Sequence, residues 1–583
     1  MTADRASTPI RRRERPDDFA ESHRTLRDSG IHTVLAGLLS MRGVSTPETA
    51  RHEQPLIPVN RLAGIGEFAD AVADGIRAGD RFTVVADYDC DGATACAIAL
   101  LGLGRCGAAI GFTVPNRMVH GYGLTPSVVD LVLEQHPETR HIITVDNGIA
   151  SVDGVSYANS KGLTVLVTDH HLPGAALPDA RVMVNPNLPW CGFPSKGLAG
   201  CGVMLYCVAA TARKISEERP EMAGALRHLP HELSDIVALG TVADVVTLDA
   251  NNRKLVNMGL RRIRHGLAHP GIKALFDVAG RDISRATSSD FGFSIAPRLN
   301  AAGRLEDMSL GIRCLVETDY DKAYEMASEL DAINRRRREI EGEMRDAAEA
   351  EVAHLDGAMT RVAFGEGFHE GVIGIVAGRI KEASHRPTVV FAPASGEDGM
   401  LKGSGRSIEG VHLRDVLDLV HKRGNGLFEK FGGHAMAAGM TLRKDRLDEF
   451  RRLFEDATAE WLGGEAPEKE WVVDGDLPDV HLGDTDIIRI LEEEVWGQAF
   501  PPPMFTGTFM VLSVRRVGSE RNHLSMNLGR GEHRYKSMRF FADRDGREDP
   551  ELGSTIVAVY QPQTNEWQGD ISVNLILQDW HTP

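Results

Sequence analysis

The sequence predicts an α/β protein in which a parallel-sheet domain, a long connecting helix, a second α/β domain and a small β-barrel follow one another. Three observations support this prediction. Apolar β-type runs alternate with helix-like segments in the first part of the chain, a long proline-free helical stretch follows, and short strands separated by turns fill the C-terminal part. A chain of 583 residues is also too long for one hydrophobic core, so several domains are expected.

The predicted parallel sheet rests on three apolar runs, residues 82–86, 141–145 and 163–167, which are typical of strands buried on both faces. Polar residues follow each run directly, and ligands of open α/β sheets bind just beyond the carboxyl ends of the strands. One acidic turn is as easily a helix N-cap or an ordinary loop, but three in one domain favour a shared site. The residues that follow the runs are Asp87, Asp89, Asp91, Asp146, Asp169, His170 and His171.

These side chains suit hydrated cations. Carboxylates with one or two His and no set of nearby thiolates favour Mn²⁺ or Mg²⁺ over structural zinc. Alternate residues of an extended segment point to the same side, so we expect Asp89 and Asp91 each to meet a different cation of a pair. Two such ions, about 4 Å apart, generate a hydroxide and stabilise the leaving oxygen of a phosphodiester.

Further residues complete the expected ligand set. Asp146, at the end of a central strand, is the candidate to bridge the two cations. Either His170 or His171 supplies an imidazole, with Asp169 as the carboxylate that orients it. An apolar helix is expected to end in Asp244, which closes the set.

Composition indicates a protein of a reducing compartment. Seven Cys occur without a CxxC pair, the N-terminal residues are Arg-rich without an apolar core, and no apolar stretch reaches membrane-spanning length. We therefore expect a cytoplasmic protein with no membrane contact. The net charge of −18 counts against nucleic-acid binding. Residues 505–540, however, hold seven basic side chains against two acidic ones, interleaved with Phe505, Phe509, His523 and Tyr535. Such a stretch is either a single-strand-binding surface or a solvated sheet face with incidental charge.

The remaining segments connect these parts. Residues 1–55 form a partly helical lead-in, within which residues 11–13 are expected to be a flexible basic tail. A polar, turn-rich region contains residues 293–304. The stretch 321–354 carries apolar residues at near-helical spacing and predicts a solvated helix that bridges two domains. Its four consecutive Arg, residues 335–338, are either a solvated face or a phosphate site.

A second α/β unit is expected at residues 359–462. Its glycine-rich segments, such as 403–406 and 432–434, let backbone N–H groups approach an anion while a charged side chain neutralises a phosphate. A tight turn beside a packed His is the alternative explanation of each segment. A linker at 464–469 precedes the barrel. The expected barrel strands include residues 507–513, 554–560 and 571–577.

The motifs, in this order, resemble those of the DHH phosphoesterase superfamily and, within it, the RecJ family of bacterial single-strand exonucleases. The resemblance centres on Asp169-His170-His171 and runs from about residue 50 to the C-terminus, barrel included. The other segments that carry it are residues 87–92, 115–117, 121–124, 146–148, 240–244, 300–304, 432–434, 437–439, 496–505 and 565–567.

The resemblance implies a DHH catalytic domain, a DHHA1-like substrate-binding domain and an OB-like nucleic-acid-binding barrel. The implied ligands of two Mn²⁺ or Mg²⁺ ions are Asp89, Asp91, Asp146, His170 and Asp244. The implied catalytic residues are His171, beside the scissile phosphate, Asp87 and Asp169. The implied substrate-binding residues are Asn300, Arg304, His369, Ser404, Arg406 and His434.

The activity that the resemblance implies is processive 5′-to-3′ degradation of single-stranded DNA to mononucleotides, in recombination and mismatch repair. It implies a monomer that acts on single-stranded DNA, with single-strand-binding protein and a repair helicase as protein partners. Two positions depart from the family pattern: Cys90 stands where Ala is more frequent, and His120 where an acidic residue is frequent. Cys90 either makes the site sensitive to oxidation or, as a buried thiol, is inert.

Two other functions fit part of the sequence. A DHH enzyme that cleaves short oligonucleotides or cyclic dinucleotides shares both α/β domains but typically lacks a barrel at residues 470–583. An inactive scaffold or a pure single-strand binder would be expected to lose metal ligands, all of which are present. The expected domains are the lead-in 1–55, the DHH domain 56–275, the connecting region 276–354, the DHHA1-like domain 355–463 and the OB-like domain 468–583.

Overall fold

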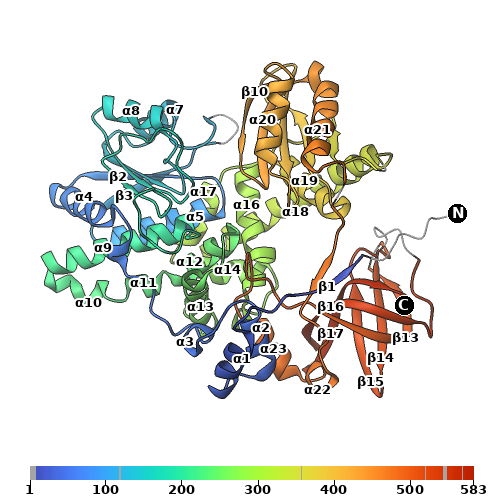
Figure 1. Cartoon of the computed structure of the whole chain (residues 1–583). Helices are drawn as coiled ribbons and strands as arrows, with labels where there is room; N and C mark the ends of the chain where they lie inside the picture. Colours follow the sequence, from blue (N-terminus) through green and yellow to red (C-terminus); the bar gives the residue numbers. More distant parts are fainter. Residues whose placement is uncertain are drawn as a thin grey trace.

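In the computed structural model of the chain, the described residues are 8–116, 120–355, 357–465, 467–518, 520–542, 548–567 and 569–583. Figure 1 shows the first α/β domain, a second α/β domain beside helix α18, and a closed barrel formed by the C-terminal strands. The predicted order of these parts is confirmed. No helix within these ranges combines the length and the apolar composition that a membrane span requires.

The first domain is built on a five-stranded parallel sheet with the order β3-β2-β4-β5-β6. The three predicted runs coincide with β2, β4 and β5 and are confirmed. Successive residues alternate between two apolar layers, so that Ile143 and Ile142 of β4 are both fully buried, on opposite faces. The strands are β2 (Arg81–Ala86), β3 (Ala109–Thr113), β4 (Thr139–Val145), β5 (Thr164–Thr168) and β6 (Val182–Val184).

Helices cover both faces of this sheet. The layer that contains Ile143 also holds side chains of α4 (Ile65–Ala78), α5 (Cys90–Arg105) and α9 (Gly200–Glu218). The opposite layer holds side chains of α7 (Pro126–Gln135) and α8 (Val152–Ser160). Helix α12 packs on α5 and α13 and ends at Asp244, as predicted. The other helices here are η2 (Pro220–Met222), α10 (Ala223–Leu226), α11 (Leu229–Glu232), α12 (Ser234–Ala243) and α13 (Ala250–Arg264).

The prediction of a turn-rich region at residues 293–304 is wrong, because this segment is helical throughout. Thr287 and Asp290 form a reciprocal capping box that starts the helical run, and Pro297 lies in a first turn, where its missing N–H costs little. Thr287 and Asp290, two polar residues of a kind typical of turns, therefore cap the start of a helix here. The elements are α14 (Pro270–Val278), η3 (Ile283–Arg285), α15 (Ser288–Asp290), the π-helix η4 (Phe291–Ile295), α16 (Ala296–Leu305) and α17 (Ser309–Val316).

The long connecting helix is confirmed as α18 (Tyr320–Val352). One of its faces is buried: Leu330 packs in the core of the first domain, and Met344 packs in that of the second. The helix therefore sets the spacing of the two domains. Arg335 and Arg337 form ion pairs with carboxylates of the same helix, which favours a structural role for this Arg run over a phosphate site.

The second domain is the expected α/β unit, with a five-stranded sheet of order β10-β11-β9-β8-β7. Only β7 and β8 run parallel. Helix α19 packs between this sheet and α18, and Gly371, just before its first turn, accepts a hydrogen bond from Arg304. The elements are β7 (Arg361–Phe364), α19 (Ile373–Ser384), β8 (Thr388–Pro393), β9 (Met400–Arg406), α20 (Leu413–Arg423), β10 (Phe428–Gly433), β11 (Ala437–Arg443), η5 (Lys444–Arg446) and α21 (Leu447–Trp461).

The C-terminal strands close into a barrel of order β13-β14-β15-β17-β16, as predicted. The hypothesis that these rings form a single-strand-binding surface is wrong for three of them. Phe505, Phe509 and Tyr535 fill the barrel core and are 3%, 1% and 5% exposed. Period-two alternation along each strand sends these rings inward. The elements are β12 (Trp471–Val473), α22 (Asp479–Leu482), α23 (Thr485–Glu493), β13 (Phe505–Val517), β14 (His523–Arg530), β15 (His533–Arg539), β16 (Thr555–Trp567) and β17 (Asp570–His581).

The N-terminal lead-in is tied to the barrel side of the molecule. Residues 11–13 are not a flexible tail, because β1 (Ile10–Arg12) pairs in parallel with β12 and Arg13 forms an ion pair with Asp474 at 2.9 Å. The prediction missed this pairing because its partner lies more than 450 residues away in the sequence. The other lead-in helices are α1 (Phe19–Asp28), α2 (Thr33–Ser40), α3 (Pro47–Ala50) and η1 (Val59–Arg61).

Two contacts join the segments that precede the barrel strands to the lead-in and to the first domain. His52 lies 2.8 Å from Glu494, and both side chains are buried. Arg253 lies 3.8 Å above the ring of Phe500. Such contacts hold the barrel in one position relative to the parallel sheet. The exact limits of the expected domains stay a prediction.

Candidate metal centre

Three acidic turns lie side by side because β2, β4 and β5 are neighbours in the sheet. The parallel ladder continues one residue past each strand: Asp87 donates its N–H to a carbonyl of β4, Asp146 to one of β5 and Asp169 to one of β6. The three side chains therefore start from one edge. We use the name carboxylate rim for Asp87, Asp89, Asp91, Asp146, Asp169, His170, His171 and Asp244.

The first acidic turn is not the extended segment that the sequence analysis expects. Asp89 is the N-cap of α5 and accepts a hydrogen bond from Gly92 N at 3.0 Å. Asp91 lies in the first turn of that helix, buried, and accepts from the backbone N–H groups of Gly200 at 2.6 Å and Cys201 at 2.9 Å. The two carboxylates are separated by the start of a helix and still face the same rim.

Asp146 occupies the middle of the rim. Its φ of 59° is left-handed, a conformation that Asp tolerates better than most residues. Gly200, the first residue of α9, faces it so closely that a Cβ there would lie 2.7 Å from the Asp146 Cβ. A glycine at that position is therefore required for the carboxylate to keep its place.

His170 faces three carboxylates of the rim. Its Nε2 lies 3.0 Å from Asp146 Oδ1, 3.5 Å from Asp244 Oδ2 and 4.0 Å from Asp91 Oδ2. Burial lowers the pKa of His170, which favours the neutral imidazole that a metal ligand needs. The loop after β6 supports this arrangement, since Asn187 donates to the His170 carbonyl and Asn185 to that of His171.

Asp169 orients His171. Its Oδ1 lies 2.7 Å from His171 Nδ1, and its two oxygens also accept backbone N–H groups of His170, His171 and Ile149. Burial lowers the pKa of His171, but the bond to Asp169 and the surrounding carboxylates outweigh it and raise the pKa to about 9. His171 is thus a proton donor held at the edge of the rim, about one-third exposed.

The rim carries more negative charge than its own side chains compensate. Burial, followed by the charges of neighbouring carboxylates, raises the pKa of Asp146 and of Asp244 well above the ordinary value. Although Asp146 Oδ1 and His170 Nε2 lie 3.0 Å apart, neither of these buried atoms nor Asp244 Oδ2 makes a hydrogen bond of ordinary geometry within the described part of the chain. Carboxylate oxygens and an imidazole nitrogen that lack hydrogen-bond partners in a buried acidic site are suitable ligands for divalent cations.

Donor atoms of the rim fall into three groups close enough to share an ion. Within each group the atoms lie within 4.8 Å of one another. Asp89 and Asp91 belong to different groups, and Asp146 belongs to two. The groups are Asp87, Asp89 and Asp146; Asp91, His170 and Asp244; and Asp146, His170 and His171.

The expected substrate-binding residues divide between the two α/β domains. Asn300 accepts a hydrogen bond from Cys90 N at 2.8 Å, so it supports the start of α5. Arg304 donates to the Gly371 carbonyl at 3.1 Å and thereby joins the first domain to the second. Both residues lie on α16, which packs against the first acidic turn.

The second domain presents Ser404 and Arg406 on β9, linked by a hydrogen bond of 3.1 Å. Both lie at the first turn of α19, where a Cβ on Gly374 would approach Arg406 Nη2 to 2.9 Å and Ser404 Oγ to 3.0 Å. His434 is exposed in the connection between β10 and β11, and no hydrogen bond or ion pair within the described residues joins it to the rim.

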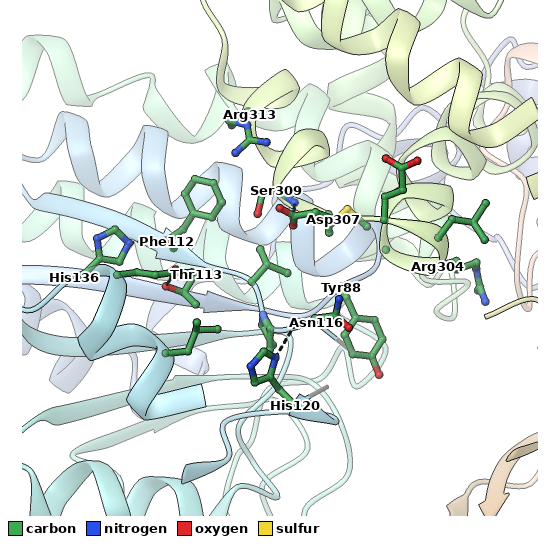
Figure 2. A pocket seen from close by; sticks show the side chains of 18 of the residues that line it. Tyr88, Phe112, Thr113, Asn116, His120, His136, Arg304, Asp307, Ser309 and Arg313 are labelled. Carbon is green, nitrogen blue, oxygen red and sulfur yellow. Dashed lines mark hydrogen bonds between the residues drawn. The ribbon is translucent and has the colours of Figure 1, made fainter. Parts of the chain in front are cut away.

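A cavity of about 720 Å³ lies beside the first acidic turn, between the edge strand β3, the connection from α16 to α17, and the second domain. Figure 2 shows Tyr88 and Arg304 on one side of it and Phe112 with His136 on the other. His369 also lines it. The His120 ring accepts a hydrogen bond from Asn116 N at 3.1 Å in its wall, whereas Arg117 lies outside the described residues.

Tyr122 is a site residue that the sequence analysis did not assign. Its hydroxyl donates to the Asp146 carbonyl at 3.3 Å and lies 3.4 Å from His171 Nδ1, and its ring stacks edge-on against Tyr88 and His171. The sequence signal for Tyr122 is its position in segment 121–124, one of the segments that carry the resemblance to the RecJ family. Cys90 is buried, and burial raises the pKa of its thiol well above the ordinary value, so it is the inert thiol of the two alternatives.

Comparisons with known proteins agree with this architecture. Three family descriptions match in order: the DHH family N-terminal domain at residues 81–241, the DHHA1 domain at 356–460 and the RecJ OB domain at 473–579. The chain is 43% identical to the single-stranded-DNA-specific exonuclease RecJ of Dickeya dadantii, over 94% of this chain and 96% of that protein.

Solved structures give the same result. RecJ from Thermus thermophilus in complex with Mn²⁺ matches with a TM-score of 0.80 at 26% identity, over 99% of this chain and 80% of that one. The same protein in complex with Mg²⁺ matches with a TM-score of 0.73 at 25% identity, over 99% and 78%. The chain therefore belongs to the RecJ family.

Proposed function

We propose that this protein is a Mn²⁺- or Mg²⁺-dependent exonuclease that degrades single-stranded DNA from the 5′ end to mononucleotides, in recombination and repair. The observation that carries the proposal is the buried, uncompensated carboxylate rim beside a domain that offers Arg406 and Ser404 to a phosphate. Membership of the RecJ family and the names of its relatives support the substrate. Solved RecJ structures with either ion support the choice of metals.

Asp89, Asp91, Asp146, His170 and Asp244 are the proposed ligands of two ions. When bound, such a pair supplies a hydroxide and charge neutralisation at the leaving oxygen of a phosphodiester. Asp146 suits the bridging position because, of the carboxylates in the three donor groups, it alone belongs to two of them. His171, kept protonated by Asp169, is placed to donate a hydrogen bond or a proton to a phosphate at the edge of the rim. Asp87, which shares a donor group with Asp89 and Asp146, is the third proposed catalytic residue.

The second domain is the proposed phosphate clamp. The α19 N-terminus adds the partial positive charge of a helix start to the charge of Arg406 and the hydroxyl of Ser404. Arg304 and His369 line the cavity beside the first acidic turn. Asn300 is proposed to act on the metal loop through Cys90 N rather than on substrate. His434, on an exposed connection of the same domain, is also proposed to bind substrate.

Arg406→Ala tests the clamp. Loss of a charge-assisted contact to phosphate should lower kcat/KM on single-stranded DNA about ten- to a hundredfold, with Mn²⁺ affinity unchanged. Arg443→Ala, on the neighbouring strand β11 and paired with Asp445, is the matched control. A parallel loss of Mn²⁺ affinity and activity would assign Arg406 a structural role instead.

The barrel argues for long single strands over short oligonucleotides or cyclic dinucleotides as substrate. Four of its basic side chains, Arg515, Arg521, Arg534 and Lys536, are exposed. Further proposals from family membership are action as a cytoplasmic monomer, with single-strand-binding protein and a repair helicase as partners.

A digest of one oligonucleotide, labelled at either end, tests the whole proposal. With Mn²⁺ present, a 5′ label should appear at once as mononucleotide, while a 3′ label should stay on progressively shorter strands. Release of the 3′ label first would reverse the polarity. Cleavage of dinucleotides with no action on long strands would instead select the oligonucleotide-cleaving alternative.

A further inference from the structure

We use the name apolar step for two exposed apolar side chains, Val245 at the end of α12 and Phe293 in η4, two elements that pack against each other. Val245 is 63% exposed and Phe293 is 84% exposed, the highest value among the large apolar side chains of the described residues. A single exposed apolar side chain is ordinary at a protein surface, but an exposed aromatic ring near a nucleic-acid site can take a stacked base.

The apolar step borders the carboxylate rim. Val245 follows Asp244 directly, at the end of α12. Phe293 lies in the π-helix η4, which packs against α12. A Cβ on Gly292, the residue before Phe293, would lie 3.7 Å from a methyl group of Val242, in the last turn of α12. Val245 and the backbone beside Phe293 thus lie at the α12 end that carries Asp244.

The backbone at both positions is held in an unusual conformation. Val245 has a φ of 60°, which is strongly disfavoured for a β-branched residue. In η4, Ser294 is held by Arg281, whose Nε donates to its hydroxyl at 3.0 Å, and by Arg298, which donates to its carbonyl. Arg298 is in turn paired with Asp331 of α18 at 2.8 Å. The exposure of Phe293 is therefore built into a fixed π-turn, a feature common at functional sites.

The chemistry of the surroundings selects the occupant. The neighbouring rim side chains are carboxylates, so the anionic backbone of a nucleic acid needs the metal ions or the Arg side chains of the second domain. An unpaired base, by contrast, is uncharged and presents a flat π-face that stacks on an aromatic ring. In a duplex the same face is covered by neighbouring pairs. A phenyl ring beside the rim therefore fits an unpaired base close to the scissile phosphate.

We propose that Phe293 is a stacking platform for one unpaired base of the substrate near the carboxylate rim. The platform positions the strand and contributes to the preference for single strands over duplexes. This inference rests on the proposed function, since it names a contact of the same substrate.

The test compares Phe293→Ala with the unchanged protein on two labelled strands, an oligothymidylate and an abasic strand of the same length. Binding is measured by fluorescence anisotropy with Ca²⁺ in place of Mn²⁺, and cleavage is measured with Mn²⁺. Loss of one base–aromatic contact should weaken binding of oligothymidylate, and raise its KM, about tenfold. The abasic strand should bind equally to both proteins. Phe293→Trp should restore oligothymidylate binding.

Leu267→Ala is the matched control, because Leu267 is 54% exposed and lies near the opposite end of α12, where His269 contacts Asp235. It should bind both strands as the unchanged protein does. Equal binding of oligothymidylate by Phe293→Ala and the unchanged protein would overturn the inference, as would an equal loss on the abasic strand. If the unchanged protein itself neither binds nor degrades single strands, the proposed function fails instead.

Discussion

The carboxylate rim and the outer surface of the barrel differ in how their charges are compensated. At the rim, Asp146 is buried and Asp244 half-buried among like charges, and each keeps a buried oxygen without a hydrogen bond in the described part of the chain. On the barrel, Arg516 is paired with Asp549, and Arg530 with two carboxylates. Buried charge that a protein leaves uncompensated indicates a functional site, whereas paired charge indicates a structural role.

The same comparison separates the barrel residues from one another. Arg530 contacts Asp476, Asp479 and the ring of Phe509, so it belongs to the structure of the barrel. Arg534 and Lys536, on the neighbouring strand, are exposed. A count of basic residues between Phe505 and Phe540 treats these groups as equal, and the structure shows that they are not.

Asp146→Ala should have the largest effect on activity. Loss of the carboxylate shared by two donor groups should reduce Mn²⁺-dependent nuclease activity by more than about a hundredfold, while the fold is kept. Asp549→Ala, which removes a carboxylate paired on the barrel, should cost little activity. Near-normal cleavage by the Asp146 variant, followed with a labelled single strand, would contradict the ligand assignment.

Gly200→Ala should act on the same rim without removing a ligand. A Cβ at residue 200 would press on the Asp146 side chain, so Mn²⁺ affinity should fall about ten- to a hundredfold, as for other groups that support ligands. Gly192→Ala is the control, since nothing lies within 4 Å of a Cβ there. Calorimetric titration with Mn²⁺ measures both, and equal affinities would show that the rim tolerates displacement of Asp146.

The barrel surface should respond to salt rather than to metal. Replacing Arg534 and Lys536 by Gln should weaken binding to a long single strand and reduce the slope of log K against log salt by about 0.7 per lost phosphate contact. Arg530→Gln should instead lower the melting temperature of the protein. If the double variant keeps the full salt slope, another surface of the molecule holds the strand.

The smallest effect on catalysis is expected at the buried contact between His52 and Glu494. Burial alone would raise the pKa of Glu494, but the hydrogen bond from His52 and neighbouring interactions outweigh it and leave the pKa below its ordinary value of 4.5. The stability that this carboxylate contributes is therefore complete above that value and is lost as the pH falls through the lower, folded-state pKa. Thermal unfolding between about pH 6 and pH 3 should show a steeper loss of stability for the unchanged protein than for Glu494→Gln. Parallel curves would assign the acid sensitivity to other groups.

The sequence predicts those features that depend on local pattern. Apolar runs that end in Asp146 or Asp169 identify both the strand and the edge of the sheet, because a parallel sheet gathers the carboxyl ends of its strands. The long helix α18 follows from apolar spacing. The helical start at Asp89 does not follow, since an extended and a capped Asp look alike until α5 is placed.

Features that depend on distant partners are not predicted. The pairing of β1 with β12 joins segments from opposite ends of the chain, and no local signal in residues 11–13 specifies it. The inward direction of Phe509 depends on the register of the barrel. The place of Tyr122 against Asp146 and His171 depends on how a loop returns to the rim.

The most direct test of the account is the position of Mn²⁺ in crystals of the protein, located by anomalous scattering. The account predicts two peaks about 4 Å apart, both in contact with Asp146, with His170 and Asp244 as further ligands. A single ion held elsewhere, or two ions that leave Asp146 without contact, would contradict the claim that the carboxylate rim is the catalytic metal centre.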